Sequence, residues 1–368
     1  MIKNIIQKAA EIIKKGGLVA FPTETVYGLG ANALDKKAVR KIFEVKGRPL
    51  DNPVIVHIAD IGDLKKLAKT IPKEAEILVD PHFKKFGLGS KKFWPGPLTL
   101  VLFKKKVVPV EVTAGGNTVA IRMPKNKIAL ELIKAAGVPI AAPSANLAGR
   151  PSPTTAKHVF EDLGNKIDLI LDGGRTKIGL ESTVLDLTVK PPQILRPGGI
   201  SFEELKKVIK DIQLHPSLLG KKLKGKAKSP GMKYRHYAPK APLILIDPVR
   251  DSKKWGKARK RHISNRVEGD LKRLKKFKDL ISFYKKQKKK VGIMISRETK
   301  KFLKNGDVVL VVGSRKNLKE VSRNLFQTLR KFDIKKVDVI LAETFPEKGI
   351  GCAIMHRLKK AAGNRLDK

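Results

Sequence analysis

The spacing of apolar residues switches repeatedly between the helical and the strand repeat along the first half of the chain. Residues 1–17 carry isoleucine and alanine on one face at helical spacing and end in two glycines, which predicts an amphipathic helix. Asp35 is placed to cap a second helix through Glu44, and a third is expected over 125–136. Short apolar runs predict strands at 18–21, 53–59, 97–103, 118–123, 139–146, 168–174 and 182–187. This interleaving predicts an α/β fold with a mixed, open sheet.

The pattern changes near residue 220. Residues 220–242 hold glycine, proline and lysine without apolar periodicity, and they are predicted to be a linker. The alternation then resumes, with strands expected at 243–247, 291–295, 308–314 and 337–343 and helices at 317–331 and 351–362. We therefore expect an N-terminal domain over 1–219, a linker or lid over 220–242, and a smaller Rossmann-like, doubly wound domain over 243–368.

The 368 residues carry a formal charge of +45. A surface of this charge attracts polyanions such as nucleic acid, although lysine-rich surfaces are also typical of hot or salty cytoplasm. The excess is densest over residues 250–290, with 18 basic and 4 acidic residues. This stretch interrupts the second domain, and we expect it to be either a solvated insertion or a contact for tRNA.

Cysteine usage and hydropathy exclude several classes of protein. Cys352 is the only cysteine, which excludes disulfide frameworks, CxxC redox motifs and cysteine-rich zinc sites. The N-terminal residues lack the continuous apolar core of a signal peptide, and the longest apolar runs are strand-sized. We expect a cytoplasmic protein without a membrane span.

Polar motifs lie beside several predicted strands, where α/β folds bind their ligands. FPTETVYGLGANA (21–33) and PSANLAGRPSPT (143–154) each follow a strand, and KGRPLDNP (46–53) precedes one. Arg122 and Arg196 end two further strands. Hydroxyl groups, an amide and several cations at strand ends predict a cavity for a multiply anionic ligand.

Each of these motifs alone has an ordinary structural explanation. Lys46 and Arg48 fit a solvated turn, His57 fits a buried core position, and Ser144 is a common turn residue. The chain has neither the full GxGxxG of dinucleotide sites nor a P-loop, so a triphosphate would be bound by other means. The joint occurrence of the motifs favours the cavity.

These motifs, with their order and spacing, resemble the threonylcarbamoyl-AMP synthase family. The shared segments are FPTETVYGLGANA, KGRPLDNP, FWPGPLTLVL, APSANLAGRPSPT, GLESTVLDL and ILRPGG. The linker SPGMKYRHYAP, with a domain after it, is similar to the long two-domain form of the family. The resemblance implies a twisted mixed sheet around a deep, basic cavity in the N-terminal domain. It also implies synthesis of threonylcarbamoyl-AMP from L-threonine, bicarbonate and ATP, with Mg²⁺ carried by the nucleotide and pyrophosphate released. It also implies that the product passes to tRNA, or to a transfer complex that takes the adenylate.

The resemblance further implies roles for individual residues. Lys46 and Arg48 match the catalytic cations. The threonine-binding positions are Thr25, His57, Arg122, Ala142 and Ser182. The ATP-binding positions are Arg48, Asn52, Thr118, Ser144, Asn146, Ser152, Arg196 and Tyr234. No protein metal site is implied, and no covalent enzyme intermediate is needed because a carbamate oxygen can attack the α-phosphorus directly.

Two other functions are compatible with parts of the sequence. An RNA-binding module would explain the charge and the aromatic residues among the lysines of 250–290, but no RRM octamer is present and tyrosine and tryptophan are scarce. A carbamoyl-transferring maturation enzyme would resemble the first domain, but such proteins add zinc-finger cysteines that this chain lacks.

Overall fold

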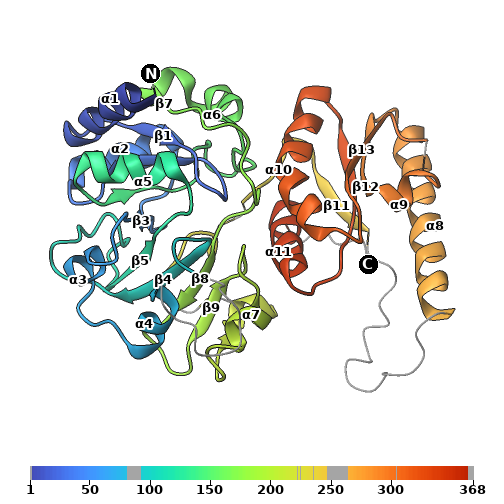
Figure 1. Cartoon of the computed structure of the whole chain (residues 1–368). Helices are drawn as coiled ribbons and strands as arrows, with labels where there is room; N and C mark the ends of the chain where they lie inside the picture. The colour runs from blue at the N-terminus through green and yellow to red at the C-terminus, as the bar shows by residue number, and fades with distance from the viewer. Residues whose placement is uncertain are drawn as a thin grey trace.

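Two α/β bodies lie side by side in the protein, joined by the linker (Figure 1). The computed structural model describes residues 2–80, 93–221, 223, 225–234, 236–246, 264–303 and 305–363. Both bodies have the predicted α/β class. In this described part of the chain, no helix is long and apolar enough to cross a membrane.

The N-terminal body is built on a mixed sheet, which has ten strands within the described residues. Their order is β10-β9-β8-β4-β5-β3-β6-β2-β1-β7. The central strand β4 pairs antiparallel with β5 and parallel with β8. The strands are β1 (Val19–Phe21), β2 (Gly28–Asn32), β3 (Ile55–His57), β4 (Leu98–Phe103), β5 (Thr118–Arg122), β6 (Ile140–Ala141), β7 (Leu169–Ile170), β8 (Thr183–Asp186), β9 (Gln193–Arg196) and β10 (Gln213–Leu214).

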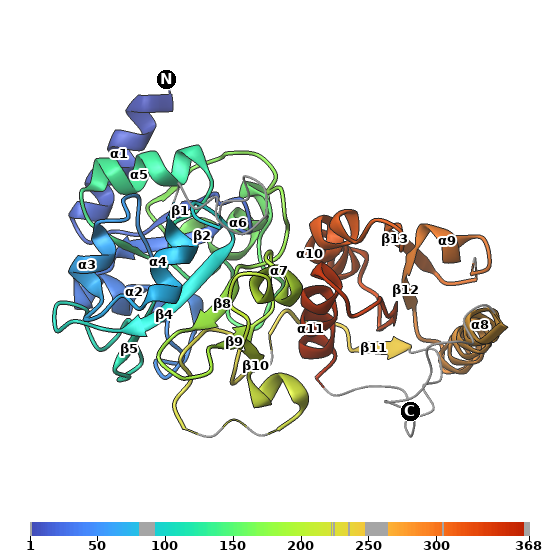
Figure 2. The ribbon, with the colours of Figure 1, turned by 60° about the horizontal axis from the view of Figure 1, so that its bottom comes forward.

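Helices cover both faces of this sheet. Helices α2, α3 and α4 share a core with Ala20 of β1, whereas α1 and α5, which lie side by side in Figure 2, share a separate core with Val19 and Phe21. The helices are α1 (Ile2–Lys14), α2 (Lys36–Lys46), α3 (Asp63–Leu67), α4 (Lys73–Val79), α5 (Lys127–Ala136), α6 (Ala156–Leu163) and α7 (Phe202–Lys206), with 3-10 turns η1 (Gly164–Lys166) and η2 (Pro216–Leu219).

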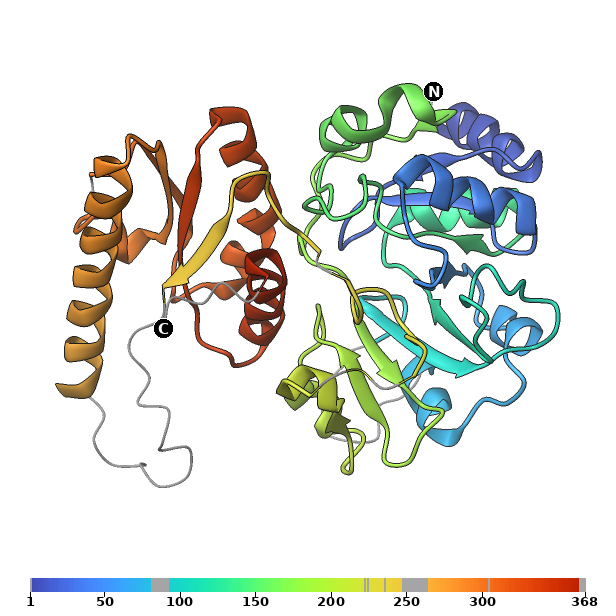
Figure 3. The same cartoon turned by 180° about the vertical axis from the view of Figure 1, so that it is seen from behind.

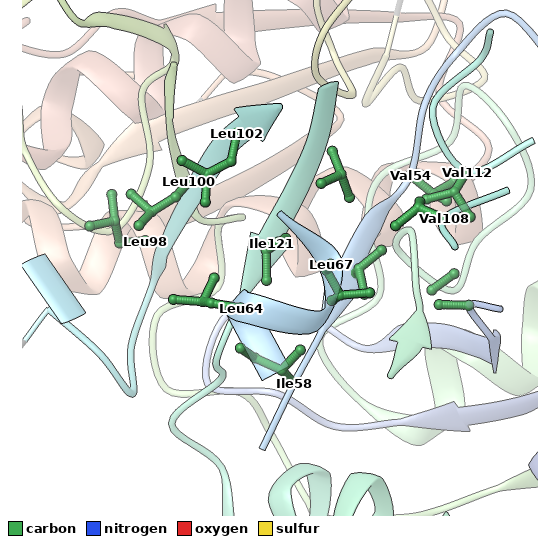
Figure 4. Close-up of a cluster of buried hydrophobic side chains, with 14 of the residues drawn as sticks. Val54, Ile58, Leu64, Leu67, Leu98, Leu100, Leu102, Val108, Val112 and Ile121 are labelled. Carbon is green, nitrogen blue, oxygen red and sulfur yellow. The ribbon is translucent and has the colours of Figure 1, made fainter. Parts of the chain in front are cut away.

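Strand alternation separates the core from the site. Leu98, Leu100 and Leu102 of β4 point into the core, where Leu64 and Leu67 of α3 pack (Figure 4). Burial of each such side chain stabilises the fold by about 1.5–3 kcal/mol. Because successive side chains of a strand point to opposite faces of the sheet, Thr99 of β4 points away from this core. Its hydroxyl lies 2.7 Å from that of Ser182.

The strand β2 was not among the predicted strands, because its residues GLGAN were grouped with the polar motif that follows the first strand. This strand pairs antiparallel with β1 and β6. A Cβ on Gly30 would lie 2.8 Å from both Ile140 Cγ2 and Phe21 Cε1. Glycine is therefore needed here for close packing between strands, rather than for a turn.

The C-terminal body is a parallel sheet in the order β11-β14-β12-β13. Helices α10 and α11 cover the face toward the N-terminal body, and α8 and α9 cover the far face (Figures 1 and 3). The strands are β11 (Leu243–Ile246), β12 (Val291–Ser296), β13 (Val308–Gly313) and β14 (Val339–Glu343); the helices are α8 (Ser264–Lys286), α9 (Arg297–Lys300), α10 (Leu318–Lys335) and α11 (Ile350–Ala362).

One interpretation of the sequence took the basic stretch 250–290 to be a solvated insertion. The structure shows that part of it is more than that. Residues 250–263 lie outside the described residues, but 264–286 form α8. Phe277 and Ile281 of this helix are buried in a core shared with Val291 and Ile293 of β12. The lysines of α8 thus belong to a helix that is integral to the second body.

Candidate active site

A polar cavity lies where the strand ends of the N-terminal body meet the linker. Its volume is about 60 Å³. Typical small-molecule sites enclose about 300–1,000 Å³, so this cavity is small in the present conformation. Its walls combine predicted site residues with four linker residues. They include Thr25, Arg48, His57, Arg122, Ala142, Ser144, Glu181, Ser182, Arg196, Pro230, Gly231, His236 and Tyr237.

The end of helix α2 directs Arg48 into this cavity. Gly47 ends the helix in the left-handed conformation at φ 58°, which glycine adopts without the strain of a Cβ. The Arg48 guanidinium then donates to the carbonyl oxygens of Asn52 (3.2 Å) and Pro53 (2.9 Å). The Pro49–Pro53 loop therefore fixes the direction of the arginine.

Arg122 is placed by the end of β5. Its guanidinium pairs with Glu24 at 2.7 Å, donates to the Thr25 hydroxyl at 2.9 Å, and donates to the Gly96 carbonyl at 3.2 Å. His57 is its register partner on β3. Burial and the charge of Arg122 lower the pKa of His57 to about 3, so this imidazole is neutral at physiological pH.

Arg196, at the end of β9, joins the sheet to the linker. Its guanidinium donates to the Ser182 carbonyl at 3.0 and 3.1 Å, to the Ser182 hydroxyl at 3.1 Å, and to the Pro230 carbonyl of the linker at 3.4 Å. Burial lowers the pKa of Arg48 and of Arg196 to about 10, so both remain charged at neutral pH. Together with Arg122 they form a cationic lining suited to an anionic ligand.

Several predicted residues support the cavity without lining it. Lys46 is buried and donates to the carbonyl oxygens of Ser144 and Asn146, which holds the loop after β6 in place. Burial lowers the lysine's pKa well below its usual value. The Ser152 hydroxyl donates to the Glu181 carboxylate at 2.5 Å. Glu181 lines the cavity, whereas Ser152 does not.

Three further residues that were predicted to bind the nucleotide do not line the cavity. Thr118 begins β5, at the opposite end of the strand from Arg122. Asn52 is buried and uses its carbonyl oxygen to accept from Arg48. Tyr234 lies outside the cavity wall and donates its hydroxyl to Asp51.

Sequence reasoning missed the linker residues that do line the cavity. It selected Tyr234 from SPGMKYRHYAP, whereas His236 and Tyr237 of the same motif form part of the wall. It also missed the buried carboxylate of Glu181 within GLESTVLDL. A charged residue at the start of a strand-forming apolar run was the available signal for Glu181.

Comparisons with known proteins agree with this architecture. A family model described as "Telomere recombination" matches residues 11–198, and one described as "Threonylcarbamoyl-AMP synthase, C-terminal domain" matches residues 200–363. The threonylcarbamoyl-AMP synthase of Pyrococcus abyssi is 51% identical over 363 residues, covering 99% of this chain and 95% of its own length. That of Bacillus subtilis is 46% identical over 362 residues, covering 98% and 94%.

A solved structure shows the same fold over the whole chain. It is the crystal structure of P. abyssi Sua5 complexed with L-threonine, with a TM-score of 0.85 and 50% identity, covering 99% of this chain and 96% of that one. Both family models and the full-length relatives span the two bodies described above. The chain belongs to the threonylcarbamoyl-AMP synthase family, in its long two-domain form.

Proposed function

We propose that this chain synthesises threonylcarbamoyl-AMP from L-threonine, bicarbonate and ATP with release of pyrophosphate. The convergence of Arg48, Arg122 and Arg196 from three separate elements on one cavity is the observation that carries the proposal. Its support from outside the chain is the full-length similarity to synthases, one of which was crystallised with L-threonine.

The Arg122 end of the cavity fits the amino acid. A guanidinium is a suitable partner for the threonine carboxylate, and the hydroxyls of Thr25 and Ser182 lie on the same wall. His57, neutral because of its low pKa, adds polarity there without a further positive charge. The threonine amine can then attack bicarbonate, and loss of water leaves a carbamate.

Arg48 and Arg196 fit the phosphates. A carbamate oxygen attacks the α-phosphorus, the new P–O bond forms, and the bond to the β-phosphate oxygen breaks as pyrophosphate leaves. Both arginines lie where they can stabilise the negative charge on the phosphate oxygens, a contribution of about 3 kcal/mol each in a dry site. Mg²⁺ would enter with ATP and share that charge, held mainly by phosphate oxygens, because both oxygens of Glu181 are already bonded by Ser152 and Arg357.

The linker must move for ATP to enter. Sites for small molecules typically enclose about 300–1,000 Å³, far more than the 60 Å³ present. Pro230, Gly231, His236 and Tyr237 of the linker form part of the wall of this small cavity. Withdrawal of the linker opens the site, and its return excludes the water that would hydrolyse the mixed anhydride.

The product would be consumed in the cytoplasm by the machinery that modifies tRNA adenosine. The positive charge of the chain favours tRNA, or a tRNA-bound transfer complex, as the partner that takes the labile adenylate.

The test is pyrophosphate release from ATP and Mg²⁺ with threonine or bicarbonate omitted in turn, and with serine replacing threonine. Release that requires both substrates and prefers threonine is the expected result. Threonine-independent release, or none from the folded protein, would refute the proposal.

A further inference from the structure

The far face of the second body carries a basic groove that the proposed reaction does not use. It lies between α8 and residues 302–305 and has a volume of about 470 Å³, which is within the range of small-molecule sites. Helix α8 is turned away from the first body, so the groove is remote from the candidate active site (Figure 3). The groove is lined by Lys278, Ser282, Lys285, Lys286, Phe302 and Asn305, among others. Of these, Lys285 pairs with Asp307 at 3.5 Å.

The lysines of α8 form a row along one side of the helix. Lys275, Lys278 and Lys286 lie at helical spacing on that side, and all three are exposed. Residues 271–290, which include them, hold ten basic residues and one acidic residue. Like charges three or four residues apart on a helix repel each other and destabilise it. An anion with several charges, lying along this side of α8, would relieve that repulsion.

Exposed aromatic rings accompany these lysines. Four phenylalanines are exposed among the described residues, and two of them lie here: Phe283 on α8, at 54%, and Phe302 in the groove, at 52%. The Lys301 ammonium lies 4.8 Å from the ring centroid of Phe302. Lysines beside exposed rings are typical of surfaces that bind single-stranded nucleic acid, where cations contact phosphates and rings stack on bases. An acidic peptide would use the lysines but leave the rings in water.

We propose that this groove binds a single-stranded segment of RNA, with the lysines of α8 on its phosphates and Phe302 stacked on a base. Unpaired loops and ends are the parts of an RNA whose bases can be stacked in this way. The inference rests on the proposed function for one point, the identity of the RNA as tRNA. It gives the second body a role of its own, which is to hold the acceptor RNA close to the source of the labile adenylate.

The first test separates the groove from the general charge of the chain. Binding of labelled oligouridine and of an unmodified tRNA transcript to the full-length protein is measured by fluorescence anisotropy. Lys278→Gln/Lys286→Gln is compared with Lys3→Gln/Lys8→Gln, which removes the same charge from exposed positions of α1. We expect the groove variant to bind RNA at least fivefold more weakly. The slope of log K against log salt should become shallower by about 1.4, since each phosphate contact to a single strand contributes about 0.7. The α1 variant should bind as the wild type does.

The second test asks whether the ring contacts a base. Phe302→Leu keeps an apolar side chain but removes the stacking surface, so it should weaken RNA binding at least fivefold and leave the salt slope unchanged. Phe160→Leu is the matched control, because Phe160 is an exposed ring of the first body, on α6. It should have no effect. Polyglutamate, which carries charge without bases, should displace the RNA only weakly.

Three results would overturn the inference. They are equal losses of RNA binding from the two lysine variants, wild-type affinity in Phe302→Leu, and displacement by polyglutamate as strong as that by RNA, which would indicate an acidic protein as the partner. All four variants should release pyrophosphate at the wild-type rate, because their side chains lie outside the candidate active site. Unfolding in urea checks the fold of each. A wild-type protein that binds RNA but lacks threonine-dependent release would refute the proposed function and leave the groove intact.

Discussion

Replacing Arg122 with methionine tests the assignment that matters most for amino-acid recognition. The side chains of Arg122 and Glu24 are only 4% and 6% exposed. The substitution therefore leaves a buried carboxylate without its partner, a cost of about 3–5 kcal/mol in unfolding free energy. It also removes a charged hydrogen bond to threonine, about 1.5–3 kcal/mol, which is roughly a 10- to 150-fold rise in the KM for threonine.

Glu24→Gln provides the matched control. In the double variant Arg122→Met/Glu24→Gln the orphaned charge is gone, so stability in urea should return toward the wild-type value. The KM for threonine, measured by pyrophosphate release at saturating ATP, should remain raised, and the KM for ATP should stay near wild type. A folded double variant with a wild-type KM for threonine would show that Arg122 does not bind the substrate carboxylate.

Three other predictions follow from the same geometry. Arg48→Ala should abolish pyrophosphate release with little change in melting temperature, because the side chain is half-buried and donates to loop carbonyls. A chain that ends at Lys228 should lose most activity with its linker, and full activity of residues 1–228 would contradict that role. Stability should fall as the pH drops from about 6.5 toward 4, because the pKa of His57 is about 3 and that of His158 about 4 in the folded state, so the unfolded chain takes up more protons. His158→Gln should flatten this fall in melting curves recorded across that range.

Local chemistry explains which parts of the site were predictable. Asp35 caps α2 by accepting from the backbone N–H groups of Lys37 and Ala38, and Gly47 ends it, so the position of Arg48 follows from a short segment. Arg122 and Arg196 were found because each ends an apolar strand. The role of Lys46 was not visible in the same way, since its partners Ser144 and Asn146 lie about a hundred residues away and belong to a different loop.

The linker shows why sequence reasoning stopped short of the complete site. SPGMKYRHYAP offers two tyrosines, and nothing local distinguishes them. Tyr237 is selected by contacts with Phe326 and Arg357, which lie on helices of the second body, whereas Tyr234 is bonded at the surface to Asp51. The tyrosine that lines the cavity is therefore selected by packing against residues about 90 and 120 positions away in the chain, which no local pattern displays.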